Sequence, residues 1–324
     1  GVKCIVKYMK ITSCLLALSI TLSGCASSGL SIASYESGDY IKTPYKAEGY
    51  AASLCVTEND VKKETVEMDS GLHATGFFDI TNGKVLYSSN LHKKLYPAST
   101  TKILTALIAL KYGNLSDTIT ISKNATVFPT GASLAHLKEG DQITLEELLY
   151  GLLLPSGNEA AVAIAEYISG SVEEFANLMN SEAYSIGATN SHFVNPHGLH
   201  DDNHYTTAYD LYLIFNECLK QEQFVKVVCE KSHTGVFKSK DGATRKEEWK
   251  NTSLYMTGEA EQPTTVEYLG GKTGNTDEAK RCLIAYTKDK NSNKYYISIV
   301  MGANGKPLLY KNMNEMLNHG VETK

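Results

Sequence analysis

The apolar run ILTALIAL at residues 103–110 constrains the fold of this chain more than any other segment. Pro97 and small hydroxyl residues precede it and Gly113 follows it, a pattern that predicts a helix with a defined start and end. This helix is apolar on nearly every face, and such a helix belongs in a protein interior. With 324 residues, 42% of them apolar, the chain is long enough to surround it with a sizeable core.

Ser99 and Lys102 stand at the start of this helix, three residues apart, and therefore share one face. A serine hydroxyl is a poor nucleophile until a neighbouring base takes its proton, and a lysine can be that base if burial lowers its pKa. A serine three residues before a lysine is expected about once by chance in a chain of this length, so other motifs must support the pair. The chain contains this spacing only here.

A second pair of polar residues, Ser156 and Asn158, follows Pro155 at the junction of two apolar segments. A tight turn there would direct both side chains to one place, and a hydroxyl and an amide between buried helices require hydrogen-bond partners. The S-x-N spacing alone carries little weight, because it also occurs at residues 88–90 and 122–124, which we interpret as solvated turns. Its position, rather than the motif, makes Ser156 the candidate.

Lys272, Thr273 and Gly274 follow a predicted strand at residues 266–269. Glycines in and before this segment allow close approach of another backbone or a ligand, the lysine provides a positive charge and the threonine a hydroxyl. A lone K-T-G is most often a surface turn. The order S-x-x-K, S-x-N and K-T-G, however, is the signature of the penicillin-binding proteins and serine β-lactamases, which this chain resembles.

Within that group the chain resembles the low-molecular-mass D-alanyl-D-alanine carboxypeptidases of serine peptidase family S11, over residues 74–321. The resemblance rests on the segments PASTTK (97–102), LPSGNEAA (154–161), NPHGL (195–199), HYTTA (204–208) and GKTG (271–274). It implies that the protein removes the terminal D-alanine of peptidoglycan stem pentapeptides, is acylated by β-lactam antibiotics and needs no cofactor.

The resemblance also implies three catalytic residues. Ser99 would attack the carbonyl between two terminal D-alanines, with Lys102 accepting its proton. Ser156 would relay a proton to the departing D-alanine amine. The positive charge of Lys272 would help keep Lys102 neutral, and backbone N–H groups of Ser99 and Asn275 would form the oxyanion hole.

The substrate-binding residues that the resemblance implies are Asn158, Lys272, Thr273, Gly274 and Asn275. Asn158 would bind the substrate backbone and orient the catalytic lysine, whereas Lys272 and Thr273 would hold the terminal carboxylate. The acyl-enzyme would then react with water, or less often with an amine.

Alternatives on the same scaffold are a β-lactamase, a D,D-endopeptidase, or a penicillin-binding sensor or scaffold without useful turnover. The intact motifs argue against the sensor, because a pure binding module has no use for a desolvated lysine beside a serine. Glu173 and Asn177 have the spacing of the deacylating residues of class A β-lactamases, but they follow Ser156 too closely in the sequence. We therefore do not expect fast β-lactam hydrolysis.

His197, His200 and His204, together with Asp201 and Asp202, suggest a metal site, and zinc D,D-carboxypeptidases exist as an unrelated class. His197 and His204 match the loop of the S11 family, which carries no metal. We therefore expect no metal and assign these histidines to packing and hydrogen bonding in the loop.

Composition excludes other classes of function. The net charge is −5, there is one tryptophan and there is no basic block, so nothing indicates nucleic-acid binding. The cysteines beyond residue 25 show no C-x-x-C spacing. Neither a zinc knuckle nor a disulfide framework is therefore indicated.

Residues 1–24 predict a lipoprotein signal peptide. Three lysines precede a short apolar stretch at residues 11–22, and the tetrad LSGC ends at Cys25. This tetrad resembles a bacterial lipobox, which implies cleavage before Cys25 and a lipid on its thiol. The mature protein would then be extracytoplasmic and anchored through this lipid to the bacterial cell membrane.

Residues 25–72 are rich in Ser, Gly, Thr, Lys and Glu and predict a flexible tether, followed by a DD-peptidase catalytic domain at 73–324. This domain opens with two apolar runs around Asn82 and Gly83, a strong hairpin signal. A helical subdomain follows at about 123–230.

Strand patterns return near the end of the chain, at residues 266–269, 281–286 and 295–301. Strands with short connections pair antiparallel. We therefore expect an α+β fold: a five-stranded antiparallel sheet flanked by helices, with the helical subdomain inserted between its two halves. The candidate site should lie in a cleft between this subdomain and the sheet edge.

Overall fold

The computed structural model describes residues 51 and 53–321, and the structural statements below concern these residues. The predicted signal peptide, Cys25 and the first part of the predicted tether lie outside them. No helix in the described part combines the length and the hydrophobicity that crossing a membrane requires.

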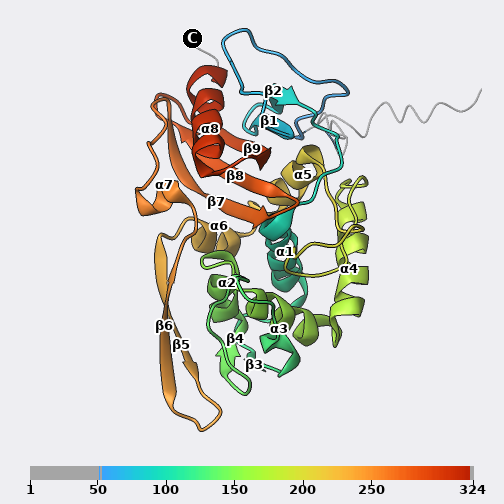
Figure 1. Cartoon of the computed structure of the whole chain (residues 1–324), viewed down its shortest axis with the longest axis vertical. Helices are drawn as coiled ribbons and strands as arrows, with labels where there is room; N and C mark the ends of the chain where they lie inside the picture. The colour runs from blue at the N-terminus through green and yellow to red at the C-terminus, as the bar shows by residue number, and fades with distance from the viewer. Residues whose placement is uncertain (1–50, 52, 322–324) are drawn as a thin grey trace, which may run out of the picture. The chain divides into compact units, whose positions relative to one another are not determined.

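A five-stranded antiparallel sheet is the centre of the fold, in the order β2-β1-β9-β8-β7 (Figure 1). Its strands are β1 (Ala74–Asp79), β2 (Lys84–Ser89), β7 (Val266–Thr276), β8 (Lys280–Asp289) and β9 (Tyr295–Ala303). All four neighbouring pairs are antiparallel. The predicted sheet, with one hairpin early in the sequence and three strands late, is therefore confirmed.

Helices cover both faces of this sheet, and two adjacent residues of β1 show how. Phe77 belongs to a core with Met313 and other residues of α8 (Lys306–Gly320). Phe78 points to the opposite face, because side chains alternate along a strand. There it stacks on Tyr212 of α5 (Ala208–Cys218), with ring centroids 4.1 Å apart.

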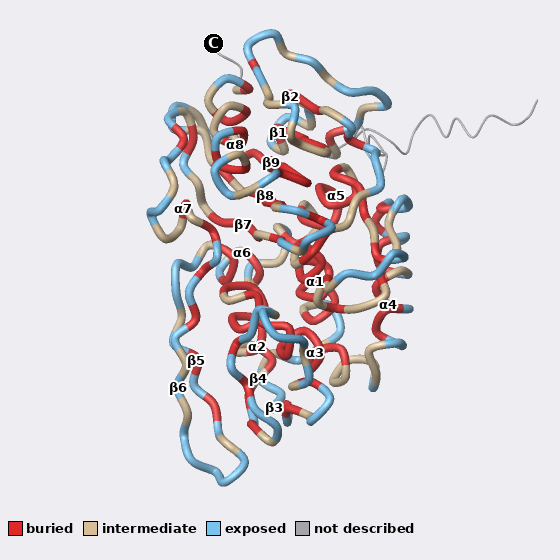
Figure 2. The backbone as a smooth tube through the Cα atoms, in the orientation of Figure 1, coloured by how far each residue is buried: buried red, intermediate tan, exposed pale blue. Residues whose placement is uncertain are grey.

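The apolar helix predicted from the sequence is α1 (Lys102–Tyr112), and its first eight residues are all buried. It begins directly after a 3-10 turn, η1 (Ala98–Thr101), and ends at Gly113. The helices of the predicted subdomain are α2 (Leu145–Leu153), α3 (Asn158–Ser169), α4 (Val172–Ser185), α5 and α6 (Glu222–Val228), with the short turn η2 (Asn124–Thr126). Figure 2 shows how much of α1, α2 and α3 is buried.

A second sheet, which the sequence did not predict, has the order β3-β4-β5-β6. Its strands are β3 (Thr118–Thr120), β4 (Gln142–Thr144), β5 (Ser232–Lys238) and β6 (Thr244–Lys250). β5 and β6 form the long hairpin at the lower left of Figure 1, which continues into the short helix α7 (Leu254–Thr257). The hairpin is mostly polar, and Trp249 is the only buried residue of β6, so hydrophobic alternation does not mark these strands.

Residues 53–72 differ from the tether that the sequence predicted, because they pack on the folded domain beside β2 and α8 (Figure 1). Cys55 is fully buried and its N–H donates to the Tyr212 hydroxyl at 2.9 Å. Further along, Lys63 Nζ donates to the carbonyl oxygen of Gly320 at 2.7 Å. An extended segment that is held by a few separate contacts shows no periodic pattern of apolar residues. The predicted tether up to residue 72 is therefore wrong for residues 53–72.

We predict that Phe78→Ala lowers the free energy of unfolding by about 3–5 kcal/mol, because the ring is fully buried against α5. Tyr184, whose exposed fraction is 74%, provides the control: Tyr184→Ala should change it by no more than about 0.5 kcal/mol. Urea titration of the two variants measures both values. Equal effects would contradict the packing described for β1.

Candidate active site

Lys102 lies at the centre of the site, fully buried at the start of α1. Its Nζ lies 2.7 Å from Asn158 Oδ1, 2.7 Å from the carbonyl oxygen of His197 and 3.1 Å from Ser99 Oγ. The first two partners can only accept, so they take both hydrogens of a neutral amine. The remaining lone pair then faces the Ser99 hydroxyl, as a general base requires.

Burial lowers the pKa of Lys102 well below its usual range, and the nearby positive charge of Lys272 lowers it further. The carboxylate of Glu159 acts in the opposite direction. Burial also lowers the pKa of Lys272, to about 7. The site therefore holds two desolvated lysines, of which Lys102 is the one beside the candidate nucleophile.

Ser156 lies in the break between α2 and α3, and its Oγ accepts a hydrogen bond from Lys272 Nζ at 2.9 Å. Its φ of +65° is uncommon for a residue with a side chain and indicates a conformation that the surrounding structure imposes. Gly157 allows this turn, because a Cβ there would lie 2.7 Å from the carbonyl oxygen of Gly151. The predicted turn thus directs the hydroxyl at the K-T-G lysine.

The K-T-G strand approaches the Ser99 turn closely, as the glycines predicted. A Cβ at Gly274 would lie 2.8 Å from the carbonyl oxygen of Pro97 and 3.3 Å from the backbone nitrogen of Ser99. On another side of the turn, Gly198 has a φ of +84°, and a Cβ there would lie 1.9 Å from the carbonyl oxygen of Ala98. Backbone contact from two sides therefore fixes the position of the serine.

The sequence-predicted residues meet at one cleft of about 410 Å³. Those that line it are Ser99, Ser156, Asn158, Thr273, Gly274 and Asn275. Lys102 and Lys272 lie buried next to it and are hydrogen-bonded to two of its serines. Of the candidate site residues, Cys25 alone lies outside the described residues.

Sequence reasoning missed several polar residues that line this cleft, among them Thr252 and Arg281. Thr252 lies between β6 and α7, and its hydroxyl is 2.5 Å from that of Thr273. Arg281 lies opposite Asn275 in the β7–β8 pair and adds a positive charge to the cleft. Arg281 could have been found from the register of the predicted strands, whereas nothing in the sequence marks Thr252.

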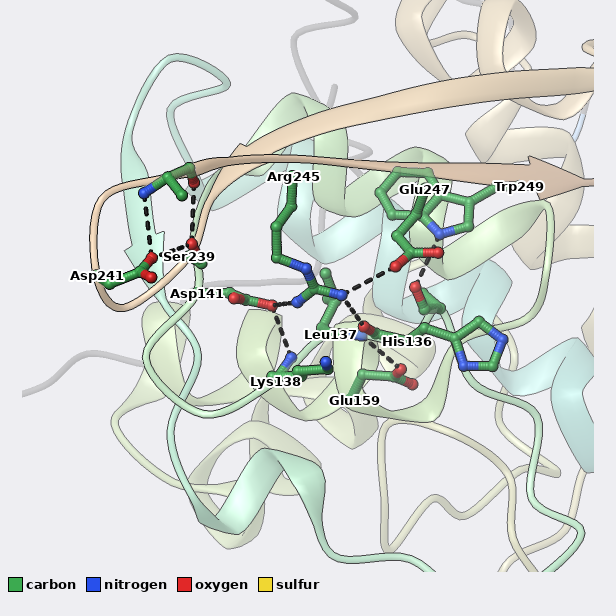
Figure 3. Close-up of polar contacts among 12 residues, drawn as sticks. His136, Leu137, Lys138, Asp141, Glu159, Ser239, Asp241, Arg245, Glu247 and Trp249 are labelled. Carbon is green, nitrogen blue, oxygen red and sulfur yellow. Dashed lines mark hydrogen bonds and ion pairs between the residues drawn. The ribbon is translucent and has the colours of Figure 1, made fainter.

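Side chains of the β5–β6 hairpin contact the segment at residues 135–141 (Figure 3). Arg245 forms an ion pair with the buried Asp141 and donates to the carbonyl oxygen of His136 at 3.1 Å. Trp249 Nε1 donates to the carbonyl oxygen of Ala135 at 2.9 Å. The hairpin thus holds the segment that follows the cleft-lining residues 131–133.

The segment at residues 133–137 is also hydrogen-bonded to the first turn of α3. Asn158 donates its backbone N–H to the carbonyl oxygen of Ser133 at 3.0 Å. The next residue, Glu159, is buried and accepts the N–H of Leu137 at 3.2 Å. The residue that holds Lys102 and this segment are therefore positioned together.

His197 and His204 have structural hydrogen bonds of the kind expected for this loop. The Nδ1 of His204 accepts the N–H of Val194 at 3.1 Å, so its Nε2 carries the proton and donates to Thr101 Oγ1 at 2.8 Å. His197 Nδ1 accepts the N–H of Leu199 at 3.1 Å. Burial lowers the pKa of His197 to about 3 and that of His204 to about 4, so both are neutral at pH 7.

Two alternatives weighed from the sequence find no geometric support in the described structure. Within residues 51 and 53–321, no three His, Cys, Asp or Glu side chains are arranged to hold a metal ion. Glu173 and Asn177 are exposed on α4 and do not line the cleft that contains Ser99. Neither residue is therefore placed to activate a deacylating water.

We predict that His204→Gln flattens the dependence of stability on pH. An unfolded histidine binds a proton below a pKa of about 6.5, whereas the folded state resists protonation down to about pH 4. The stabilisation is complete above pH 6.5 and is lost as the pH falls, by about 1.4 kcal/mol per pH unit. Urea unfolding at pH 7, 6 and 5 should give a slope shallower by about that amount in the variant, and identical slopes would contradict a buried neutral His204.

Comparison with known proteins places this chain in one family. The model of the peptidase S11 family, described as D-alanyl-D-alanine carboxypeptidase, matches residues 61–305. The chain therefore belongs to this family.

Curated relatives carry the same description. The D-alanyl-D-alanine carboxypeptidase DacF of Bacillus subtilis is 36% identical over 250 residues, which are 74% of this chain and 60% of that protein. The D-alanyl-D-alanine carboxypeptidase of Streptomyces sp. strain K15 is 34% identical over 261 residues, 76% of this chain and 87% of that protein. The matched part of the chain thus spans 60% of the length of the Bacillus relative.

Solved structures agree with the fold. The crystal structure of the Streptomyces K15 DD-transpeptidase has a TM-score of 0.71 and 31% identity, covering 79% of this chain and 99% of that one. The D-alanyl-D-alanine carboxypeptidase DacD from Francisella tularensis has a TM-score of 0.67 and 25% identity, covering 82% of this chain and 73% of that one. The five-stranded sheet and inserted helices are thus shared with D,D-peptidases.

Proposed function

We propose that this protein is a serine D-alanyl-D-alanine carboxypeptidase that removes the terminal D-alanine of peptidoglycan stem peptides. The observation that carries the proposal is the buried amine of Lys102, whose lone pair faces Ser99 Oγ at 3.1 Å. Membership of the S11 family supports the same reaction.

The acylation step uses groups that lie around the cleft. Lys102 takes the Ser99 proton while Oγ attacks the carbonyl carbon between the two D-alanines. The backbone N–H groups of Ser99 and Asn275 stabilise the oxyanion that forms. A proton then passes to the leaving amine through Ser156, free D-alanine departs, and the remaining peptide is esterified to Ser99.

Substrate binding uses the side of the cleft that is formed by β7 and β8. Lys272 and Thr273 hold the terminal carboxylate, next to the glycine that allows close approach, and Arg281 adds a second positive charge. Asn158 contacts the substrate backbone while its Oδ1 orients Lys102. Water completes the cycle by hydrolysing the ester, and an amine in place of water would give the transpeptidation for which the Streptomyces K15 neighbour is named.

The proposal includes acylation by β-lactams, which present a strained amide and a carboxylate to the same groups. Slow release of that acyl group is expected, because Glu173 lies outside the cleft. A β-lactamase would hydrolyse a chromogenic cephalosporin rapidly, a D,D-endopeptidase would prefer cross-linked peptides, and a sensor would acylate without turnover. These outcomes distinguish the alternatives experimentally.

The site of action is proposed from the sequence. A signal peptide at residues 1–24 and a lipid on Cys25 would place the catalytic domain outside the cytoplasmic membrane. A domain that acts on peptidoglycan must work there. Membrane anchoring rests on the lipobox-like tetrad, and metabolic labelling of the protein with a fatty acid, compared with Cys25→Ala, tests it.

We predict that Ser99→Ala abolishes release of D-alanine from an acylated Lys-D-Ala-D-Ala peptide, because within residues 51 and 53–321 Ser99 has the only hydroxyl that is hydrogen-bonded to Lys102 Nζ. Residual activity should be at least about 10³-fold lower. A metal chelator should leave the wild-type rate unchanged. If folded wild-type protein releases no D-alanine while penicillin still labels Ser99, the carboxypeptidase proposal fails for this substrate.

We predict that Lys272→Met moves the acidic limb of the pH profile for penicillin acylation to higher pH. The positive charge of Lys272 lowers the pKa of Lys102, so removing it raises that pKa and leaves Lys102 protonated over a wider range. The rate constant for acylation measured between pH 5 and 9 reports the shift. A limb that stays in place or moves to lower pH would show that the two lysines are not coupled as described.

A further inference from the structure

Thr252 contacts the K-T-G segment although no motif marks it. Its hydroxyl lies 2.5 Å from that of Thr273, and either oxygen can be the donor. Among the described residues, the Thr252 hydroxyl makes no other hydrogen bond. Both threonines line the cleft that contains Ser99.

Hydrogen bonds hold the residues on either side of Thr252, and none of these bonds involves a substrate. On one side, Asn251 Nδ2 donates to the carbonyl oxygen of Glu230 at 3.1 Å and its Oδ1 accepts the N–H of Ser253 at 2.9 Å. On the other side, the N–H of Leu254 donates to the Tyr310 hydroxyl at 2.8 Å. The Thr252 hydroxyl is therefore presented from a fixed loop, and its alignment requires no ordering when substrate binds.

The number of hydroxyl hydrogens determines whether Thr252 or Thr273 can donate to a ligand. Two hydroxyls carry two hydrogens, and one of them occupies the contact between Thr252 and Thr273. If Thr252 donates, Thr273 keeps its own hydrogen for a ligand. A carboxylate only accepts, so it favours this arrangement, in which each hydrogen bond polarises the next.

We propose that Thr252 is a positioning residue that makes Thr273 a donor to the terminal carboxylate of the substrate. The inference rests on the proposed function, because it assumes that Thr273 faces a carboxylate. It adds a selective role: Thr252 favours peptides and β-lactams that end in a free carboxylate over their neutral amides and esters. A hydroxyl is needed for this role, and a methyl group of the same size cannot replace it.

The test compares Thr252→Val with Thr252→Ser on two matched peptides. One is acylated Lys-D-Ala-D-Ala, and the other is the same peptide with a terminal amide. Thr252→Val should lower kcat/KM for the free acid about fivefold and leave kcat/KM for the amide within about twofold of the wild-type value. Thr252→Ser should restore the wild-type ratio of kcat/KM for the acid to kcat/KM for the amide. Thr244→Val, at the far end of the β5–β6 hairpin, is the matched control and should change neither value.

Two results would overturn the proposal. One is an equal loss on acid and amide by Thr252→Val, which would indicate a general effect on the cleft. The other is no loss on either substrate. Acylation of Ser99 by benzylpenicillin and by its methyl ester provides the same acid-to-neutral comparison. If wild-type protein releases no D-alanine, this pair still tests Thr252 separately from the carboxypeptidase activity.

Discussion

The site depends on how the amine of Lys102 is held. Two carbonyl oxygens, from Asn158 and His197, take its hydrogens, and the lone pair is left for Ser99. Burial makes this arrangement stable, because a protonated amine without a counter-charge is costly in a low-dielectric interior. α1 must therefore pass through the core, so the need for an apolar helix and the need for a neutral base are met by one segment.

Close backbone contacts set the rest of the geometry. Gly198 and Gly274 bring a loop and a strand against the turn that carries Ser99, and Ser156, which lines the same cleft, adopts a left-handed conformation. Residues from widely separated parts of the chain thus meet at distances that side chains at these glycines would prevent. The long β5–β6 hairpin completes the arrangement, because Arg245 and Trp249 contact the segment at residues 135–141.

Much of this arrangement could be predicted from local signals. Asn82 and Gly83 marked the β1–β2 hairpin, and Pro97 and Gly113 marked the two ends of the apolar helix. The three motifs identified the lysines and serines that the fold brings together.

What could not be predicted depends on tertiary contacts. The β5–β6 hairpin is polar along most of its length and is stabilised by isolated anchors such as Trp249. Residues 53–72 follow the surface without a period, held by contacts such as that between Cys55 and Tyr212. Thr252 forms its hydrogen bond with Thr273 only because the segment after β6 lies beside β7. In each case the partner is distant in sequence, and no local pattern records it.

The pairing of β1 with β9 has a consequence for how the domain forms. Ala74 lies opposite Met301, so this ladder of the sheet joins two strands that are far apart in the sequence. The contact order is correspondingly high, and folding of such topologies is slow. Until β9 arrives, the β1–β2 hairpin has an unpaired edge and an apolar face, both of which favour aggregation. The strands up to β9 therefore have to be present before the sheet, and with it the cleft, can close.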